Sequence, residues 1–517
     1  MRTPIVVAVA AVLVAAAGGG YYVLEVLPKQ QLRAGLDQAL ATLPPGTTAS
    51  YKDANYSPVS HQAVVTGLTL HGEISGDPPQ PFDITIDSVE TTNANLDLTN
   101  SWAKAAANPA AISPDTALAV ADSIVLKGVT IHSAAINVTE DTVRVTKASL
   151  YPWALLHDGM PAWKDIRATL EARSQPPAMA DLQPILRVEA AVMMGVAYDT
   201  YEAGPAKGTE TLPGIDIAFD VNKMAGSGFD RGVMRGGAAE GVTVKGARFG
   251  AVSVDRVAMG ASDLREPMTR LINGEPVSPA MLNGMRFGRF EYTGITVQPP
   301  GMAATHIGGF SFGPAVFAQG MPVSGELAWT DVSVTKAQMP DAQTRDAFDR
   351  LGLDTMTVSF ALAYNWDVAQ QRATLHDTML KVNELGTVTL AADVTNVMPN
   401  VGAFAQARLA HARLRFDDAS LVERLLRIGA ARTGADPAVY RAQIAEMARQ
   451  QSIAIGGGSP VILAAGQSAA DFVNSPHSLT IELSPPAPVP FLAIQSAAAD
   501  PGGFAALVGL TVSANQP

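Results

Sequence analysis

The segment from Gly309 to Gly313 has the Gly-x-Ser-x-Gly pattern that, in many hydrolases, holds a nucleophilic serine, here Ser311. Such a serine needs a strand before it, a helix directly after it, and a histidine base within hydrogen-bond reach. Two histidines follow along the chain, His376 and His411. The residues after Gly313 continue a β-rich pattern, so we expect Ser311 to be an ordinary strand residue. A serine hydrolase is kept as a remote alternative.

Two further patterns resemble catalytic or cofactor motifs. Ser101 and Lys104 match Ser-x-x-Lys, but the companion motifs of penicillin-recognising enzymes do not occur in the sequence. Gly226, Gly228 and Gly232 miss the dinucleotide-binding spacing by one residue, and no helical pattern follows them. The sequence therefore predicts no catalytic residue, no cofactor-binding residue and no enzymatic activity.

Metal ligands are sparse along the chain. The chain has no cysteine and no His-Glu-x-x-His motif, which excludes thiolate sites and the common zinc helix. No two histidines lie within five residues of one another: His61, His71, His132, His157, His306, His376, His411 and His477. We predict no metal and no cofactor. Asn55 and Asn137 fit the glycosylation sequon by pattern alone.

The overall charge argues against nucleic acid as a partner. The formal net charge is −12, and Lys and Arg form no long cluster. Charged residues make up 16% of the chain, below the usual quarter, while apolar residues reach 47%. The absence of cysteine fits an oxidising compartment, where free thiols are reactive.

The amino-terminal residues are expected to hold the chain at a membrane. Ile5–Leu24 is a run of twenty uncharged residues, long enough to cross a bilayer as a helix. Cleavage as a signal peptide after the alanines at 15–17 is the alternative. We favour an uncleaved anchor over residues 1–26, because Tyr21 and Tyr22 fall where an interfacial aromatic belt would lie. We therefore expect a single-pass protein of the bacterial inner membrane, with most of the chain in the periplasm.

Residues 27–46 read as an amphipathic helix and linker next to the membrane. Its leucine stripe has helical spacing: Leu32, Leu36, Leu40 and Leu43. The stripe either lies on the bilayer or docks on the first strands. We favour docking, because the segment carries few cations with which to bind anionic lipid.

Residues 47–415 are expected to form an elongated, mostly antiparallel β region with helical inserts. Apolar and polar residues alternate there with the period of two that marks half-buried strands. A motif of Gly, apolar, Ser or Thr, apolar recurs at Gly67, Gly128, Gly241 and Gly294, with Asp331 as a variant. We predict that each motif begins a strand after a glycine bulge or turn. Helices are predicted near residues 184–197, 262–273 and 341–351, the second capped by Ser262.

Residues 416–517 are expected to contain a helical pair, strands and an Ala/Pro-rich tail. Asp436 followed by Pro437 has the pattern of an N-cap with proline at the first helical position. The sequence predicts helices within 418–451, a return to strand at Ser459–Ile462, and another strand at Ser478–Leu483. The fold class is therefore mainly β, with a few packed helices.

Most of the aromatic residues occur in strand-like runs, where they are expected to pack in a core: Tyr51, Tyr56, Phe287, Phe290, Tyr292, Trp329, Tyr364 and Trp366. A long sheet with one apolar face could equally hold acyl chains. Apolar strand composition alone does not distinguish an open face from a covered one.

Both ends of the chain resemble the YdgA-like family of bacterial envelope proteins. At the amino-terminal end the resemblance rests on Gly18–Tyr22, the helix Gln31–Leu43 and the Ser50–Tyr56 strand. At the carboxy-terminal end it rests on Asp436–Tyr440 and Ser459–Ile462, while residues from about 109 to 321 depart from the family. The chain is more distantly similar to AsmA-like proteins, a resemblance that implies inner-membrane anchoring and lipid handling. The YdgA-like family supplies no catalytic residues.

These observations predict a non-enzymatic, membrane-anchored envelope protein with a structural or interaction role. The alternative is binding or transfer of lipids or other hydrophobic ligands along an apolar β-groove. The expected partners are the inner membrane, and lipids or another envelope protein, without nucleic acid.

Overall fold

The computed structural model describes residues 32–34, 36–37, 40, 47–74, 80–95, 97–134, 136–157, 179–212, 215–339, 341–398 and 406–516. Within these ranges strand residues outnumber helical ones and the strands pair antiparallel, which confirms the predicted mainly β class. No helix of this part of the chain is long and apolar enough to span a membrane. The predicted anchor, Ile5–Leu24, lies outside the described residues.

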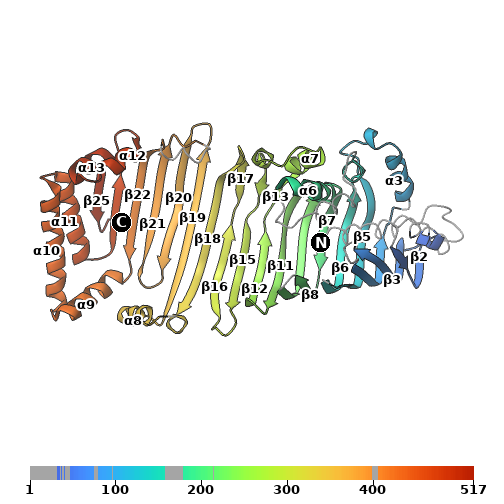
Figure 1. The fold of residues 1–517 in the computed structure, drawn as a ribbon, viewed down its shortest axis with the longest axis horizontal. Helices are drawn as coiled ribbons and strands as arrows, with labels where there is room; N and C mark the ends of the chain where they lie inside the picture. Colours follow the sequence, from blue (N-terminus) through green and yellow to red (C-terminus); the bar gives the residue numbers. More distant parts are fainter. Residues whose placement is uncertain are drawn as a thin grey trace. The chain divides into compact units, whose positions relative to one another are not determined.

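The chain divides into two compact units. Unit 1 contains residues Met1–Phe290 with Gln298–Pro300, and unit 2 contains Glu291–Val297 with Gly301–Pro517. Figure 1 shows long strands lying side by side in each unit.

The sheet of unit 1 is a meander of long strands. Its strands are β1 (Thr48–Ser50), β2 (Asp53–Ser57), β3 (Gln62–Ile74), β4 (Gln80–Thr92), β5 (Leu118–Ser133), β6 (Ile136–Leu150), β7 (Val196–Ala203), β8 (Ala206–Leu212), β9 (Ile215–Val221), β10 (Lys223–Asp230), β11 (Val233–Gly246), β12 (Gly250–Met259), β13 (Ser262–Asp263) and β14 (Arg286–Phe287). β3, β4, β5 and β6 pair in succession. β7 pairs with one half of β6 and β8 pairs with the other half. β10 then pairs with β7, and β9 pairs with β8.

The recurring glycine motif lies in the middle of these strands, which corrects the prediction that it begins them. Gly67, Gly128 and Gly241 lie inside β3, β5 and β11, with φ of 59°, 61° and 61°. One residue in this left-handed conformation shifts the alternation of side chains by one position. In β3, Ala63 and Val65 are buried before the break, and Leu68 and Leu70 after it. Each motif glycine therefore keeps both halves of a long strand facing the same side.

The main core of unit 1 covers one face of β3, β4 and β5. Val65, Ile84 and Leu126 are buried there together with Leu32 and Leu36 of the amino-terminal helix. Burial of these two leucines confirms the predicted docking of that helix on the first strands. Leu40 is part-exposed, and Leu43 lies outside the described residues.

Short helices connect the strands of unit 1: α3 (Leu98–Ala107), η1 (Pro109–Ala111), α4 (Pro152–Leu155), α6 (Met179–Met194), α7 (Arg265–Ile272) and η2 (Pro279–Leu282). α6 and α7 lie near the strand ends in Figure 1 and pack together through a second cluster that includes Ala190 and Leu271. The predicted helix at 262–273 begins later, at Arg265. Ser262 does not cap it but lies in β13, where its hydroxyl accepts the Gly288 amide at 2.9 Å.

The described strands of unit 2 form a second antiparallel meander. They are β15 (Phe290–Gln298), β16 (Thr305–Phe312), β17 (Ala315–Ala318), β18 (Met321–Thr335), β19 (Thr355–Asp367), β20 (Arg372–Val382), β21 (Gly386–Thr395), β22 (Arg408–Asp418), β23 (Ser478–Leu483), β24 (Val489–Pro490) and β25 (Leu510–Ala514). The motif residues Gly294 and Asp331 again have positive φ, 62° and 52°, within β15 and β18.

The described helices of unit 2 are η3 (Lys336–Gln338), α8 (Ala342–Leu351), α9 (Leu421–Thr433), α10 (Pro437–Gly456), α11 (Pro460–Asn474), α12 (Phe491–Ala497) and α13 (Pro501–Val508). Among them, α8, α9 and α10 lie where helices were predicted, whereas α11 replaces a predicted strand and α12 and α13 lie in the predicted Ala/Pro-rich tail. Asp436 caps α10 as predicted, accepting the amide of Ala438 at 2.9 Å. The predicted strand at Ser459–Ile462 is wrong: Pro460 occupies the first turn of α11, a position that suits its fixed φ.

Candidate functional site

The surroundings of Ser311 do not match those of a hydrolase nucleophile. Ser311 lies in β16, opposite Ala328 of β18, and the next element is the strand β17. His376 lies on β20, three strand spacings or about 14 Å across the sheet from β16. His411, on β22, is two strands further and binds Glu482 at 3.0 Å. Neither histidine is within hydrogen-bond reach of Ser311, so this site does not form.

The other short motifs also lie in ordinary secondary structure. Ser101 is in α3, where its hydroxyl donates to Asp97 at 3.2 Å, and Lys104 is exposed. Gly226 and Gly228 lie within the strand β10. Among the residues that the structure describes, no three metal-binding side chains cluster together.

One face of the unit 1 sheet carries rows of apolar residues that run across the strands. Two rows lie on one side of the mid-strand break: Ile124, Val145, Tyr201, Gly226, Gly237 and Met259; and Leu126, Val143, Ala203, Met224, Ala239 and Val257. Two more lie on the other side: Val129, Glu140, Ala206 and Val221; and Ile131, Val138, Gly208, Phe219, Val244 and Val252. We call these four rows the unit 1 apolar face.

The unit 1 apolar face is mostly buried at β5, whereas from β6 to β12 its larger side chains are part-exposed and only the small Ala203 and Ala206 are buried. Its β5 residues, such as Ile124 and Leu126, are buried in the core that contains Leu32. The branched, aromatic and Met side chains of the later strands all keep part of their surface exposed: Val138, Val143, Val145, Tyr201, Phe219, Val221, Met224, Val244, Val252, Val257 and Met259. Within the described ranges, none of the three buried clusters includes a residue of β8–β12.

Glu140 is the one charged side chain in the four rows. It lies on β6 between Val129 of β5 and Ala206 of β8. Burial raises the pKa of its carboxyl. The same face carries Tyr201, whose pKa is raised to about 12, first by burial and then by the negative charge of Glu140.

The opposite face of the same strands is polar and charged. Lys147 binds Asp199 at 2.7 Å, and this ammonium lowers the pKa of the Asp199 carboxyl. Lys207 and Asp220 lie 3.6 Å apart on β8 and β9. Because both partners of each pair are exposed, such pairs contribute little stability. They do show which face is adapted to water.

Unit 2 repeats the arrangement with larger side chains. One row crosses six strands: Phe310, Trp329, Phe360, Leu380, Val388 and Phe416. Trp329 is 38% exposed and Leu380 is 44% exposed, whereas Phe416 packs edge-on against Phe472 of α11 at 6.0 Å. The rings of Phe310 and Trp329 are 4.4 Å apart. The unit 2 apolar face is thus partly exposed from β16 to β20 and contacts α11 at β22.

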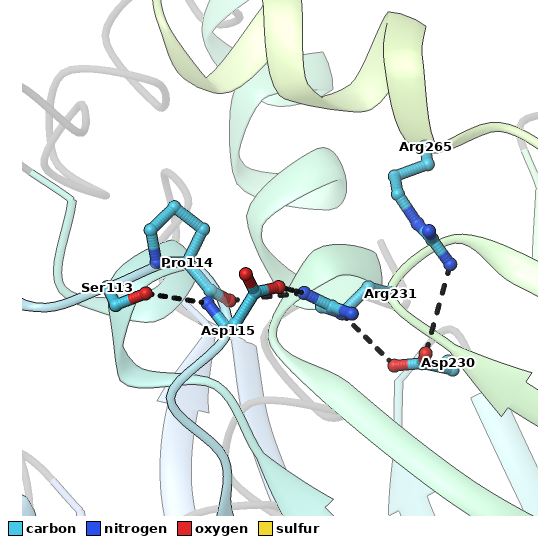
Figure 2. A network of polar contacts seen from close by, with 6 residues as sticks. All are labelled: Ser113, Pro114, Asp115, Asp230, Arg231 and Arg265. Carbon is cyan, nitrogen blue, oxygen red and sulfur yellow. Dashed lines mark hydrogen bonds and ion pairs between the residues drawn. The ribbon is translucent and has the colours of Figure 1, made fainter.

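A network of ion pairs fixes the loop before β5 in unit 1 (Figure 2). Arg231, in the β10–β11 turn, donates to Asp115 at 2.6 Å, to the Pro114 carbonyl at 3.3 Å and to Asp230 at 3.2 Å. Its guanidinium also lies 4.7 Å from the ring centre of Tyr151. Arg265 at the start of α7 approaches Asp230 at 3.8 Å. These contacts join four segments of one unit and have a structural role.

Motif searching missed Glu140, because the residue belongs to no catalytic pattern. The alternation of apolar and polar residues along β6 does indicate the face on which Glu140 lies, provided that the break in the alternation is placed correctly. Once a break is placed at the Gly128 position of β5 and at the equivalent point of β6, Glu140 falls on the apolar side with Val138 and Val143. Without the break it falls on the polar side.

Comparison with known protein families gives a partial match. A family model described as an uncharacterized protein matches residues 379–515. No curated protein and no solved structure matches the chain.

Proposed function

We propose that this protein binds an elongated apolar ligand, such as a lipid acyl chain, on the unit 1 and unit 2 apolar faces. The proposal rests on a difference along the unit 1 apolar face: most of its β5 side chains are buried, whereas its larger side chains from β6 to β12 are part-exposed. A chain lying on these rows removes apolar surface of both partners from water, which contributes about 25 cal/mol per Å².

The composition of the face favours a lipid chain over a protein surface. Protein interfaces contain about one hydrogen bond per 100–200 Å². Across the four rows of unit 1, polar side-chain atoms come from Glu140 and Tyr201 alone. An acyl chain needs no more, because it has few hydrogen-bonding groups to satisfy.

The proposed location is the outer side of a bacterial inner membrane, with Ile5–Leu24 as an uncleaved anchor. The length of that apolar run and the resemblance of both chain ends to YdgA-like envelope proteins support this assignment. In this proposal the protein binds its ligand without chemical conversion.

The test compares two neighbouring residues on opposite faces of β11. Val244→Glu places a charge on the unit 1 apolar face, whereas Thr243→Glu places one on the polar face. Full-length protein is purified in mild detergent, and co-purifying lipids are quantified by mass spectrometry. We expect V244E to lose most of the bound lipid and T243E to retain it. Lipid content that is negligible in the unmodified protein, or equal in both variants, would contradict the proposal.

A second candidate function, interaction with another envelope protein, is supported by the carboxy-terminal helices. Ile453 and Ile455 near the end of α10 are 64% and 60% exposed, and Leu492 on α12 is 57% exposed. Large apolar side chains with this exposure often belong to interfaces when they cluster. Ile453→Asp should abolish cross-linking to a partner in membranes while lipid content stays unchanged. Unchanged cross-linking would exclude this surface.

A further inference from the structure

Glu140 occupies an unusual place for a carboxylate. Its cross-strand neighbours are Val129 and Ala206, and Val138 and Val143 share its face along β6. Its Oε1 atom is buried from solvent and has no hydrogen-bond partner among the described residues. A buried acceptor without a donor destabilises the folded protein, and charged acceptors do so most.

The position of Glu140 gives this acceptor a potential use. It lies where the covered part of the unit 1 apolar face, on β5, meets the open part, on β6 and β8. The Glu140 side chain is itself part-exposed, although its Oε1 atom is shielded. A ligand chain on the open rows would therefore lie against this side chain, and it would reach Oε1 by displacing the atoms that shield it. Resting on the proposed function, we infer that Glu140 is the polar contact of the bound ligand, and that the ligand is an amphiphile carrying a hydrogen-bond donor, a hydroxyl or an ammonium group.

The chemistry of the site selects among amphiphiles. A donor satisfies Oε1, whereas a saturated chain without a donor leaves it unpaired. An anionic head group such as a fatty-acid carboxylate meets a like charge when Glu140 is ionised. The raised pKa of the Glu140 carboxyl is consistent with a site that has no cation of its own. Tyr201, whose pKa is about 12, keeps its hydroxyl proton and adds a second polar group to the same face.

The experiment measures displacement of the fluorescent reporter N-phenyl-1-naphthylamine from full-length protein freed of lipid. Three probes share a sixteen-carbon chain: hexadecanol, hexadecylamine and the methyl ether of hexadecanol. We expect the better donor probe to bind about five- to tenfold more tightly than the ether, the range that one hydrogen bond to a buried acceptor supports. A ratio near one in the unmodified protein overturns the inference while leaving apolar binding intact. Failure of all three probes to bind overturns the proposed function as well.

Variants assign the preference to one carboxyl. Glu140→Val removes the acceptor and suits a strand, so it should bind the ether at least as well as the unmodified protein and lose the donor preference. Glu140→Gln keeps an acceptor oxygen. If the natural ligand carries a hydroxyl group, E140Q should still bind hexadecanol more tightly than the ether. If the natural ligand carries an ammonium group, E140Q should lose the preference for hexadecylamine. Glu210→Val is the control, because Glu210 lies on the same face in the outermost row, opposite Ile136. Loss of the donor preference in E210V, or its survival in E140V, overturns the inference.

Discussion

Glu140 makes the stability of unit 1 depend on pH in the direction opposite to that of an ion-paired carboxylate. Its folded pKa is raised by burial above the unfolded value of about 4.3. The folded state thus binds the proton more tightly. Its stabilising contribution is complete below about pH 4.3 and is lost as the pH rises through the folded pKa.

We therefore expect Glu140→Gln, which stays neutral, to gain stability relative to the unmodified protein as the pH rises from 4 to 8. The measurement is the difference in urea unfolding midpoint at several pH values. Carboxyls with lowered pKa, such as Asp199 and Glu482, titrate in both proteins and cancel in this difference. A difference that does not change with pH would show that Glu140 is not desolvated.

The motif glycines are required by backbone conformation and by close approach to a neighbouring side chain. At Gly128 φ is +61°, and a Cβ atom would lie 2.1 Å from Oδ2 of Asp87. Gly128→Ala should therefore destabilise unit 1 by more than the roughly 1–2 kcal/mol of a left-handed alanine. Gly274→Ala is the matched control, with φ of +79° and nearest atoms at 3.7 Å or beyond. Adding Asp87→Ala to G128A should recover part of the loss in a double-mutant cycle. No recovery would mean that backbone strain alone accounts for it.

At the scale of elements, the amino-terminal helix packs on unit 1 through few buried side chains. Leu36 is 2% exposed in the core of unit 1, whereas Leu40 is part-exposed. Leu36→Ala should lower the free energy of unfolding of unit 1 by about 2–5 kcal/mol, the range for a buried leucine. Leu40→Ala should cost clearly less. Hydrogen exchange of the β3 amides reports both values, and equal losses would contradict docking through Leu36.

Substitution of Arg231 tests whether the loop before β5 needs a planar guanidinium group to hold it in place. Arg231→Lys keeps the charge but removes the several donors that reach Asp115, Pro114 and Asp230. We expect faster hydrogen exchange at residues 112–117 in R231K and no change in Arg235→Lys, whose side chain is exposed on the adjacent strand. Unchanged exchange in R231K would show that the charge alone is sufficient.

Sequence patterns predicted elements well where the determinant was local. The alternation of strands, the Asp436 cap and the leucine stripe all depend on neighbouring residues. The structure has the first two, and it buries Leu32 and Leu36 of the stripe. The glycine motif was located correctly but placed at strand starts, because alternation in a bulged strand looks like two separate strands. The strand predicted at Ser459–Ile462 came with the resemblance to the YdgA-like family, whereas Pro460 itself suits the first turn of a helix.

At the scale of the whole molecule, the open apolar faces could not be predicted from the sequence. Val65 of β3 is buried and Val244 of β11 is part-exposed, yet both sit in the same alternating, valine-rich context. The difference arises because Leu32 and Leu36, from a distant segment, cover one part of the sheet and not the other. Coverage is a tertiary property, so local composition does not report it. For the same reason the raised pKa of Glu140 was not predictable.

The docked helix also limits how far unit 1 can lie from the proposed anchor. Seven residues, and so eight Cα–Cα steps, separate Leu24, at the end of the apolar run, from Leu32 in the core. A fully extended chain of that length spans about 29 Å at most. If the run is an anchor, the core of unit 1 is held within that distance of the membrane surface, where an apolar face can receive lipid directly.

We therefore expect anchoring and ligand occupancy to depend on each other. Full-length protein with a carboxy-terminal tag should remain with inner membranes after a high-salt wash and carry bound lipid. Insertion of about thirty Gly/Ser residues after Pro28 preserves the anchor but removes the short tether, because a flexible linker of that length adds roughly 30 Å of root-mean-square span. We expect this variant to stay in the membrane fraction with less bound lipid. A soluble product that begins near Gly18 would show instead that the apolar run is a cleaved signal, and unit 1 would then have to acquire its ligand away from the bilayer.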